Sequence, residues 1–195
     1  MAIDAQSVKA LRDETGLPMM KCKEALTETG GDAAKAKDLL RKQGFETAAK
    51  RADRATAAGA VGSYIHFNGR VGVMVEVNCE TDFVANTDDF KGLIKDLAMH
   101  IAFADPAALS RDEIDPAAVE AERAIYREQA KGKPPQAIDK IIEGKLKKFY
   151  ADGCLLEQPF SKDTAKTISD VLTEVIGRTG ENISIKRFAR FEIGA

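Results

Sequence analysis

Three cysteines and two histidines are the side chains of this 195-residue sequence best suited to covalent or metal chemistry. Cys22, Cys79 and Cys154 lie far apart and form no C-x-x-C pair, so they favour neither a disulfide framework nor a zinc site. A thiol enzyme needs a base beside its nucleophile, and Cys79, His100 and Asp82 are the candidates. Such a pair is recognised by geometry, so the sequence gives this hypothesis little support.

Motifs for nucleotide binding and hydrolysis are absent from the sequence. It contains no G-x-x-x-x-G-K-[ST] loop, no G-x-G-x-x-G turn after a strand and no G-x-S-x-G elbow. We therefore expect a protein that is not an enzyme, with no catalytic residue, no metal and no cofactor.

The composition is typical of a folded protein with a mixed surface. Apolar residues make up 44% and charged residues 31%, and the formal net charge is −2. This balance argues against indiscriminate binding of DNA or RNA. The first residues do not form a signal peptide, and no apolar run approaches the roughly 20 residues that span a bilayer. We therefore expect a cytoplasmic protein with reduced cysteines and no membrane contact.

The N-terminal residues predict a small helical unit followed by a linker. Residues 1–44 contain three short helical segments, with Ser7 as a candidate cap of the first and Met19 in the apolar stripe of the second. Gly44 lies where a glycine would end the third helix. Residues 45–58, rich in alanine, lysine and arginine, predict a solvated helical linker.

At Gly59 the hydrophobic period changes from that of a helix to that of a strand. Valines alternate along 71–77, and Asn68-Gly69 before them is a strong signal for a β-hairpin turn. A long amphipathic helix follows, for which Asn86 or Thr87 is the candidate cap.

The rest of the chain predicts more helices and one further strand. About 113–152 predicts an antiparallel helical hairpin with Gly132-Lys133-Pro134-Pro135 at its turn. Asp163 can cap a last helix, and apolar residues at odd positions of 183–193 predict a closing strand. Residues 59–195 thus predict an α+β domain: a three-stranded antiparallel sheet packed with helices, from which the helical hairpin protrudes.

Several motifs in order along the chain carry a family resemblance. The most specific is Val77-Asn78-Cys79-Glu80-Thr81-Asp82-Phe83-Val84-Ala85-Asn86, supported by Met99-His100-Ile101-Ala102, Gly132-Lys133-Pro134, Gly180-Glu181-Asn182-Ile183 and Arg190-Phe191-Glu192. Over essentially its whole length the chain resembles bacterial elongation factor Ts, the guanine nucleotide exchange factor for elongation factor Tu. Longer members carry two related core halves, so this chain resembles the short form. The resemblance implies that 1–44 is a ubiquitin-associated-like module and that 59–195 is the core exchange domain.

The resemblance also implies which residues bind elongation factor Tu, in its GDP-bound and nucleotide-free states. Phe83 would be an apolar wedge near the magnesium and phosphate side of the partner's nucleotide site, with Asp82 holding it in register. The N-terminal module would hold the base side. The expected partner-binding residues are Arg12, Met19, Met20, Thr81, Asp82, Phe83, Val84, His100, Gly180 and Glu181. GDP would then leave and GTP rebind without covalent chemistry.

Each of these assignments has a structural alternative. Phe83 could staple its loop to the helix that begins near Thr87, Met19 and Met20 could belong to the core, and His100 could be a packing histidine. Two further functions compete with exchange. One is an adaptor whose helical module binds peptides or ubiquitin-like partners. The other is an RNA-binding translation protein, which the charge balance disfavours.

We also expect a homodimer. A three-stranded sheet leaves edges that must be paired or covered, and two-fold pairs are the commonest closed assembly. The contact is expected around Phe188, Arg190 and Phe191 of the closing strand. The alternative is a monomer whose sheet face is covered by its own helix 164–176.

Overall fold

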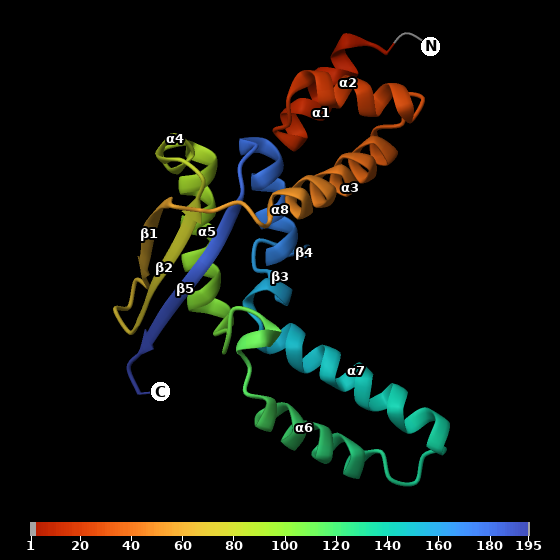
Figure 1. Cartoon of the computed structure of the whole chain (residues 1–195), viewed down its shortest axis with the longest axis vertical. Coiled ribbons are helices and arrows are strands. Elements are labelled where there is room, and N and C mark those ends of the chain that lie inside the picture. The colour runs from red at the N-terminus through yellow and green to blue at the C-terminus, as the bar shows by residue number, and fades with distance from the viewer. Residues whose placement is uncertain (1–2, 195) are drawn as a thin grey trace. The chain divides into compact units, whose positions relative to one another are not determined.

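The computed structural model describes residues 3–194 of the chain (Figure 1). Its α-helices are α1 (Ala5–Thr15), α2 (Met19–Glu28), α3 (Ala33–Arg51), α4 (Asp82–Ala85), α5 (Asp88–Ala104), α6 (Pro116–Gln129), α7 (Pro135–Gly153) and α8 (Ile168–Thr179). The strands are β1 (Ala58–Ile65), β2 (Val71–Cys79), β3 (Pro159–Phe160), β4 (Asp163–Thr167) and β5 (Ile183–Glu192). An antiparallel sheet has the order β1-β2-β5, and β3 and β4 pair separately. The predicted α+β fold is confirmed.

Two compact units make up the chain. The first consists of the residues through Ala60 together with Val77–Ile94 and Val171–Ser184. The second consists of Val61–Glu76, Lys95–Asp170 and the residues from Ile185 onward. No helix within residues 3–194 is long and apolar enough to cross a membrane.

In the first unit, α1, α2 and α3 pack around a small apolar core. Gly16, with φ of 68°, ends α1, and the Asp32 carboxylate caps α3 by accepting from the Lys35 amide at 3.1 Å. Ser7 does not cap α1, because the helix is already formed at Ala5. The buried residues of this core are Val8, Leu11, Cys22, Ala25, Leu26, Ala36 and Leu40.

Helix α3 continues past Gly44, where the sequence predicted its end. A Cβ at Gly44 would lie 3.6 Å from Cγ2 of Thr173 in α8, so this glycine is in the helix interior, close to α8. The helix runs on to Arg51, and residues 45–51 are helical, as expected for that segment. The predicted C-terminal glycine is therefore wrong, since nothing at Gly44 breaks the backbone hydrogen bonds.

The predicted β-hairpin is confirmed. The His66 amide donates to the Val71 carbonyl at 2.9 Å, and Gly69 closes the turn with φ of 69°. A left-handed conformation of this kind suits glycine. Val73, Val75 and Val77 of β2 are buried, while Met74 between them is exposed.

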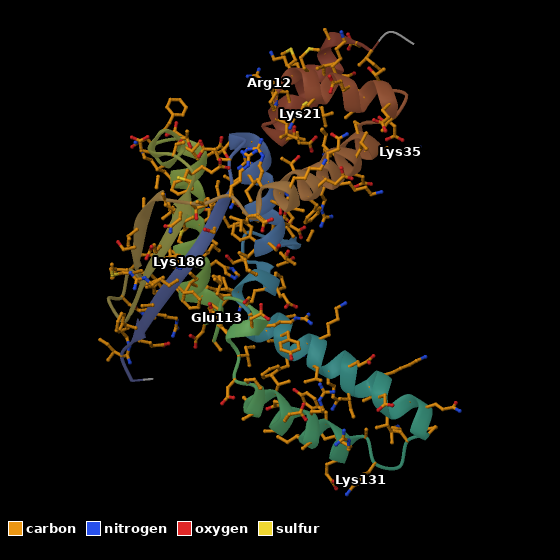
Figure 2. The ribbon with its side chains drawn as sticks, in the orientation of Figure 1. Arg12, Lys21, Lys35, Glu113, Lys131 and Lys186 are labelled. Atoms are coloured by element: carbon orange, nitrogen blue, oxygen red, sulfur yellow. The ribbon has the colours of Figure 1, made fainter. Side chains whose placement is uncertain are left out.

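In the second unit, α6 and α7 form the predicted helical hairpin. They lie side by side and are joined by the turn that carries Lys131 (Figures 1 and 2). At its base, Arg111 forms an ion pair with Glu157, with Nε–Oε1 at 2.5 Å, and stacks over the Tyr150 ring at 4.4 Å.

The predicted cap at Asp163 is wrong. Asp163 begins β4, which pairs with β3, and α8 starts later, at Ile168. The cap of α8 is a reciprocal pair: the Thr167 hydroxyl accepts from the Asp170 amide at 3.1 Å, and the Asp170 carboxylate accepts from the Thr167 amide at 2.9 Å.

Strand β5 does not keep one apolar face along its length. Ile183 and Ile185 are buried, Lys186 and Arg187 are both exposed, and the alternation then continues in the opposite phase. Phe191, near the end of β5, is exposed, whereas Ile183 at its start is buried. In the second unit, a groove of about 450 Å³ is lined in part by the exposed apolar side chains of Ile65, Met74, Phe191 and Ile193, and also by the half-buried Val71.

Candidate partner-binding site

The loop after β2 folds into the short helix α4, which presents Phe83 to solvent. Thr81 is extended, with φ of −130°, and its hydroxyl accepts from the Val84 amide at 3.4 Å. Val84 is 4% exposed and anchors the turn, whereas Phe83 is 79% exposed. The staple alternative is therefore wrong, because it requires Phe83 to pack against its own chain.

Glu181 holds this loop from the segment between α8 and β5. Its carboxylate accepts two hydrogen bonds from Thr81, one from the amide at 3.0 Å and one from the hydroxyl at 2.7 Å. Gly180 before it has φ of 77°, a backbone conformation that side chains disfavour. The structure thus brings Thr81–Val84, Gly180 and Glu181 into one cluster.

A second carboxylate, which the sequence did not single out for a role, belongs to the same cluster. Glu80 accepts from the Asn182 amide at 2.6 Å and from Arg54 at 3.4 Å. These bonds, the amide bond first, hold the pKa of Glu80 below its usual range. Asn182 in turn donates through its side chain to the carbonyls of Ala52 and Arg54. The position of Glu80 inside the most specific motif was the only sequence signal for this role.

The N-terminal module presents the other expected contacts. Arg12 of α1 is exposed, and Figure 2 shows it on the N-terminal helices with Lys21. Met19 and Met20 at the start of α2 are 49% and 63% exposed. The expectation that Met19 belongs to the apolar stripe of α2 is wrong, because that stripe begins at Cys22.

His100 lies inside the second unit. Its side chain is 1% exposed; Nε2 lies 2.9 Å from Oε1 of Gln158, and Nδ1 accepts from the Ser161 amide at 3.3 Å. Burial lowers the pKa of His100. These contacts are those of a packing histidine, so a direct contact with a partner would require the side chain to be uncovered.

Cys79 has the environment of a structural thiol. It is buried, and its Sγ donates to the Thr81 carbonyl at 3.1 Å. Burial, with the nearby negative charges of Glu181 and Asp82, raises the pKa of Cys79. Since the thiolate is the nucleophile, these surroundings oppose the thiol-enzyme hypothesis. Within residues 3–194, no group of His, Cys, Asp and Glu side chains is arranged to hold a metal ion.

The chain is similar in sequence to known proteins along nearly its whole length. Residues 21–195 match the family model described as elongation factor TS. The chain is 56% identical over 196 residues to elongation factor Ts of Geotalea uraniireducens. The alignment covers 100% of this chain and 91% of that protein. It is 53% identical over 194 residues to elongation factor Ts of Thermoanaerobacter pseudethanolicus, covering 98% and 95%.

The chain is therefore a translation elongation factor of the exchange-factor class. It belongs to the elongation factor Ts family, the nucleotide exchange factors for elongation factor Tu, and it is not an enzyme. Its length is close to that of these relatives, in agreement with the predicted short form.

Proposed function

We propose that the chain releases GDP from elongation factor Tu by inserting Phe83 into the partner's nucleotide domain, on the magnesium and phosphate side. The observation that supports this most strongly is the exposure of a large apolar side chain on a loop held by Glu80 and Glu181. A rigid aromatic that is buried on binding is typical of an interaction hot spot. Asp82, exposed beside it, would make the polar contacts that set its register.

Exchange of this kind follows from linkage. A factor that binds the nucleotide-free partner more tightly than the GDP-bound partner must weaken GDP binding by the same factor. Incoming GTP then displaces the exchange factor. The interaction needs no covalent step, which is in keeping with the buried, weakly acidic Cys79.

The second proposed contact is made by the N-terminal module. Arg12, Met19 and Met20 would hold a helix of the partner on the base side of its nucleotide, where flexible methionines adapt to a protein surface. This proposal keeps the division into a ubiquitin-associated-like module at 1–44, a linker at 45–58 and an exchange domain at 59–195. His100 would then support the exchange domain from inside it.

A homodimer in the cytoplasm is the proposed working form. The apolar groove over Ile65, Met74 and Phe191 supports it, because exposed apolar patches on a sheet are typical of protein interfaces. Arg190 does not belong to this face: its guanidinium, 15% exposed, forms ion pairs with Asp105 and Glu192. We place the contact on Phe191 and its neighbours across the sheet.

Release of fluorescent GDP from elongation factor Tu tests the exchange mechanism. The wild-type chain should accelerate release, and Phe83→Ala should slow the accelerated rate by about 30-fold, the loss expected for a hot-spot side chain of about 2 kcal/mol. Phe103→Ala is the matched control, since Phe103 is 80% exposed and belongs to the last turn of α5, in the second unit. A normal rate with Phe83→Ala would contradict the wedge.

A further inference from the structure

We propose that Glu80 and Glu181 are positioning residues that fix the Phe83 loop for exchange. They form a reciprocal clamp: each carboxylate accepts a hydrogen bond from the backbone amide of the residue that follows the other glutamate. This inference rests on the proposed function. It changes the role that the family resemblance implied for Glu181, from a contact with the partner to a contact within the chain.

The reciprocity is visible in the two amide bonds. Glu181 accepts from the amide of Thr81, which follows Glu80, at 3.0 Å. Glu80 accepts from the amide of Asn182, which follows Glu181, at 2.6 Å. Two segments that lie 100 residues apart in the chain are therefore joined by a matched pair of charge-assisted hydrogen bonds, which are stronger than neutral ones.

Both oxygens of Glu181 are already engaged by Thr81. Oε2 accepts from the amide, and Oε1 accepts from the hydroxyl at 2.7 Å. That hydroxyl also accepts from the Val84 amide, so the clamp continues into the first turn of α4. A carboxylate used in this way acts through Thr81 on the position of Phe83, and the partner does not need to touch it.

A third segment closes the cluster. The Asn182 side chain donates to the carbonyls of Ala52 at 3.3 Å and Arg54 at 2.9 Å, just after α3 ends, and Arg54 pairs with Glu80. The clamp thus joins the exit of the N-terminal helices to the loop that carries Phe83. A loop ordered before binding loses less conformational entropy when it docks, so the wedge binds more effectively.

The test uses Glu181→Gln and Glu80→Gln in the full-length chain. Each change keeps the side chain's shape but removes the charge and one acceptor. Glu143→Gln, on the exposed surface of α7, is the matched control. The first readout is amide hydrogen exchange of residues 81–84 in the free protein, which needs no partner. The second is the saturated rate of GDP release from elongation factor Tu, in the wild-type and Phe83→Ala backgrounds.

We expect both variants to speed amide exchange in the loop by about tenfold and to lower the saturated release rate by about five- to tenfold. A neutral amide oxygen accepts more weakly than a carboxylate, and these fold-changes correspond to a loss of about 1–1.4 kcal/mol. The control should change neither. In the Phe83→Ala background, the glutamine variants should cause no further loss, because the clamp acts through Phe83.

Three outcomes would overturn the clamp. Unchanged amide protection would show that the carboxylates do not hold the loop. Faster amide exchange with a normal release rate would show that they hold it without serving exchange. Losses that add fully to that of Phe83→Ala would show a direct contact with the partner. Failure of the proposed function looks different: Phe83→Ala alone would keep the full rate while loop protection still depended on both glutamates.

Discussion

Two phenylalanines have nearly the same exposed fraction, 79% at Phe83 and 80% at Phe103, yet their surroundings differ. Phe103 lies in the last turn of a long helix, whereas Phe83 lies in a four-residue helix that would not persist alone. Side chains from distant segments hold that short helix in place. Phe83 is therefore a stronger candidate for partner binding than Phe103, because its backbone is held in place by hydrogen bonds from distant segments.

His100 should make the stability of the chain depend on pH. Its pKa is lowered in the folded state by burial, while an unfolded histidine titrates near 6.5, so below that pH the unfolded chain binds more protons. The stabilisation is present above about pH 6.5 and is lost as the pH falls through the folded pKa. Denaturant unfolding at a series of pH values measures this loss, from about one unit above the unfolded pKa of about 6.5 to about 1.5 units below it.

His100→Gln removes the titrating ring and should flatten this part of the pH dependence. His66→Gln changes the chain's other histidine and is the control. An equal slope in the wild-type and His100→Gln chains would contradict the assignment.

The exposed residues of the N-terminal module should affect affinity more than rate. Met20→Ala and Arg12→Ala are expected to raise the concentration for half-maximal GDP release by about five- to tenfold each, as for interface side chains that contribute about 1 kcal/mol. The release rate at saturation should stay close to normal. Lys23→Ala, also exposed on α2, is the control. Unchanged titration curves would favour the adaptor, whose module serves other partners.

At the scale of elements, the continuity of α3 makes a sharp prediction about Gly44. Alanine there gains helix propensity, and its Cβ would make an ordinary contact with Thr173 at 3.6 Å. Gly44→Ala should therefore stabilise the chain by about 0.4–1 kcal/mol and raise the melting temperature by about 1–4 °C. If the helix ended at Gly44, the same substitution would instead lower the stability and the melting temperature.

Gly16→Ala is the contrasting variant. Gly16 has φ of 68°, and a Cβ there would lie 2.6 Å from Cδ of Arg178. We expect it to lower the melting temperature, because the backbone is left-handed and the space is already filled. Scanning calorimetry on both variants checks the pair.

The sequence predicted best those elements in which a hydrophobic pattern repeats over many residues or in which the turn residues are distinctive. The valines of β2 and the apolar stripe of α5 each repeat a pattern over many residues, and glycine and proline mark the turn between α6 and α7. The β3–β4 ribbon was missed because strands of two and five residues are too short to show a repeat, and Asp163 resembled a helix cap. Helix α4 was missed because four residues have no period at all.

The candidate site was predictable only in part, because some of the residues that contact each other there lie far apart in the sequence. The motif around Phe83 could be found because its residues are consecutive. Glu80 and Asn182, which hold it, lie 102 residues apart, and the pairing depends on how α8 and β5 meet the loop. Likewise, the burial of His100 follows from Gln158, 58 residues further on. Local patterns carry no information about such pairs.

For the molecule as a whole, the apolar groove on the sheet predicts that two chains associate in solution. Light scattering at micromolar concentration should give twice the chain mass of 21.1 kDa. Met74→Lys puts a charge into the apolar groove and should yield the monomer, since burying an unpaired charge is costly. Ala165→Lys, on exposed β4, should leave the mass unchanged. A wild-type monomer with full exchange activity would contradict the dimer.

The pairing of Thr81 with Glu181 also has a consequence for the order in which the protein is made. During translation, Thr81 is synthesised one hundred residues before Glu181, whose carboxylate accepts its hydrogen bonds. Until then the nascent loop carries an aromatic side chain with nothing to fix its backbone, and contacts of such long separation form slowly. Under the proposed mechanism, the growing chain would therefore lack the fixed Phe83 contact, although its N-terminal helices, which pack against neighbours close in sequence, can already be folded.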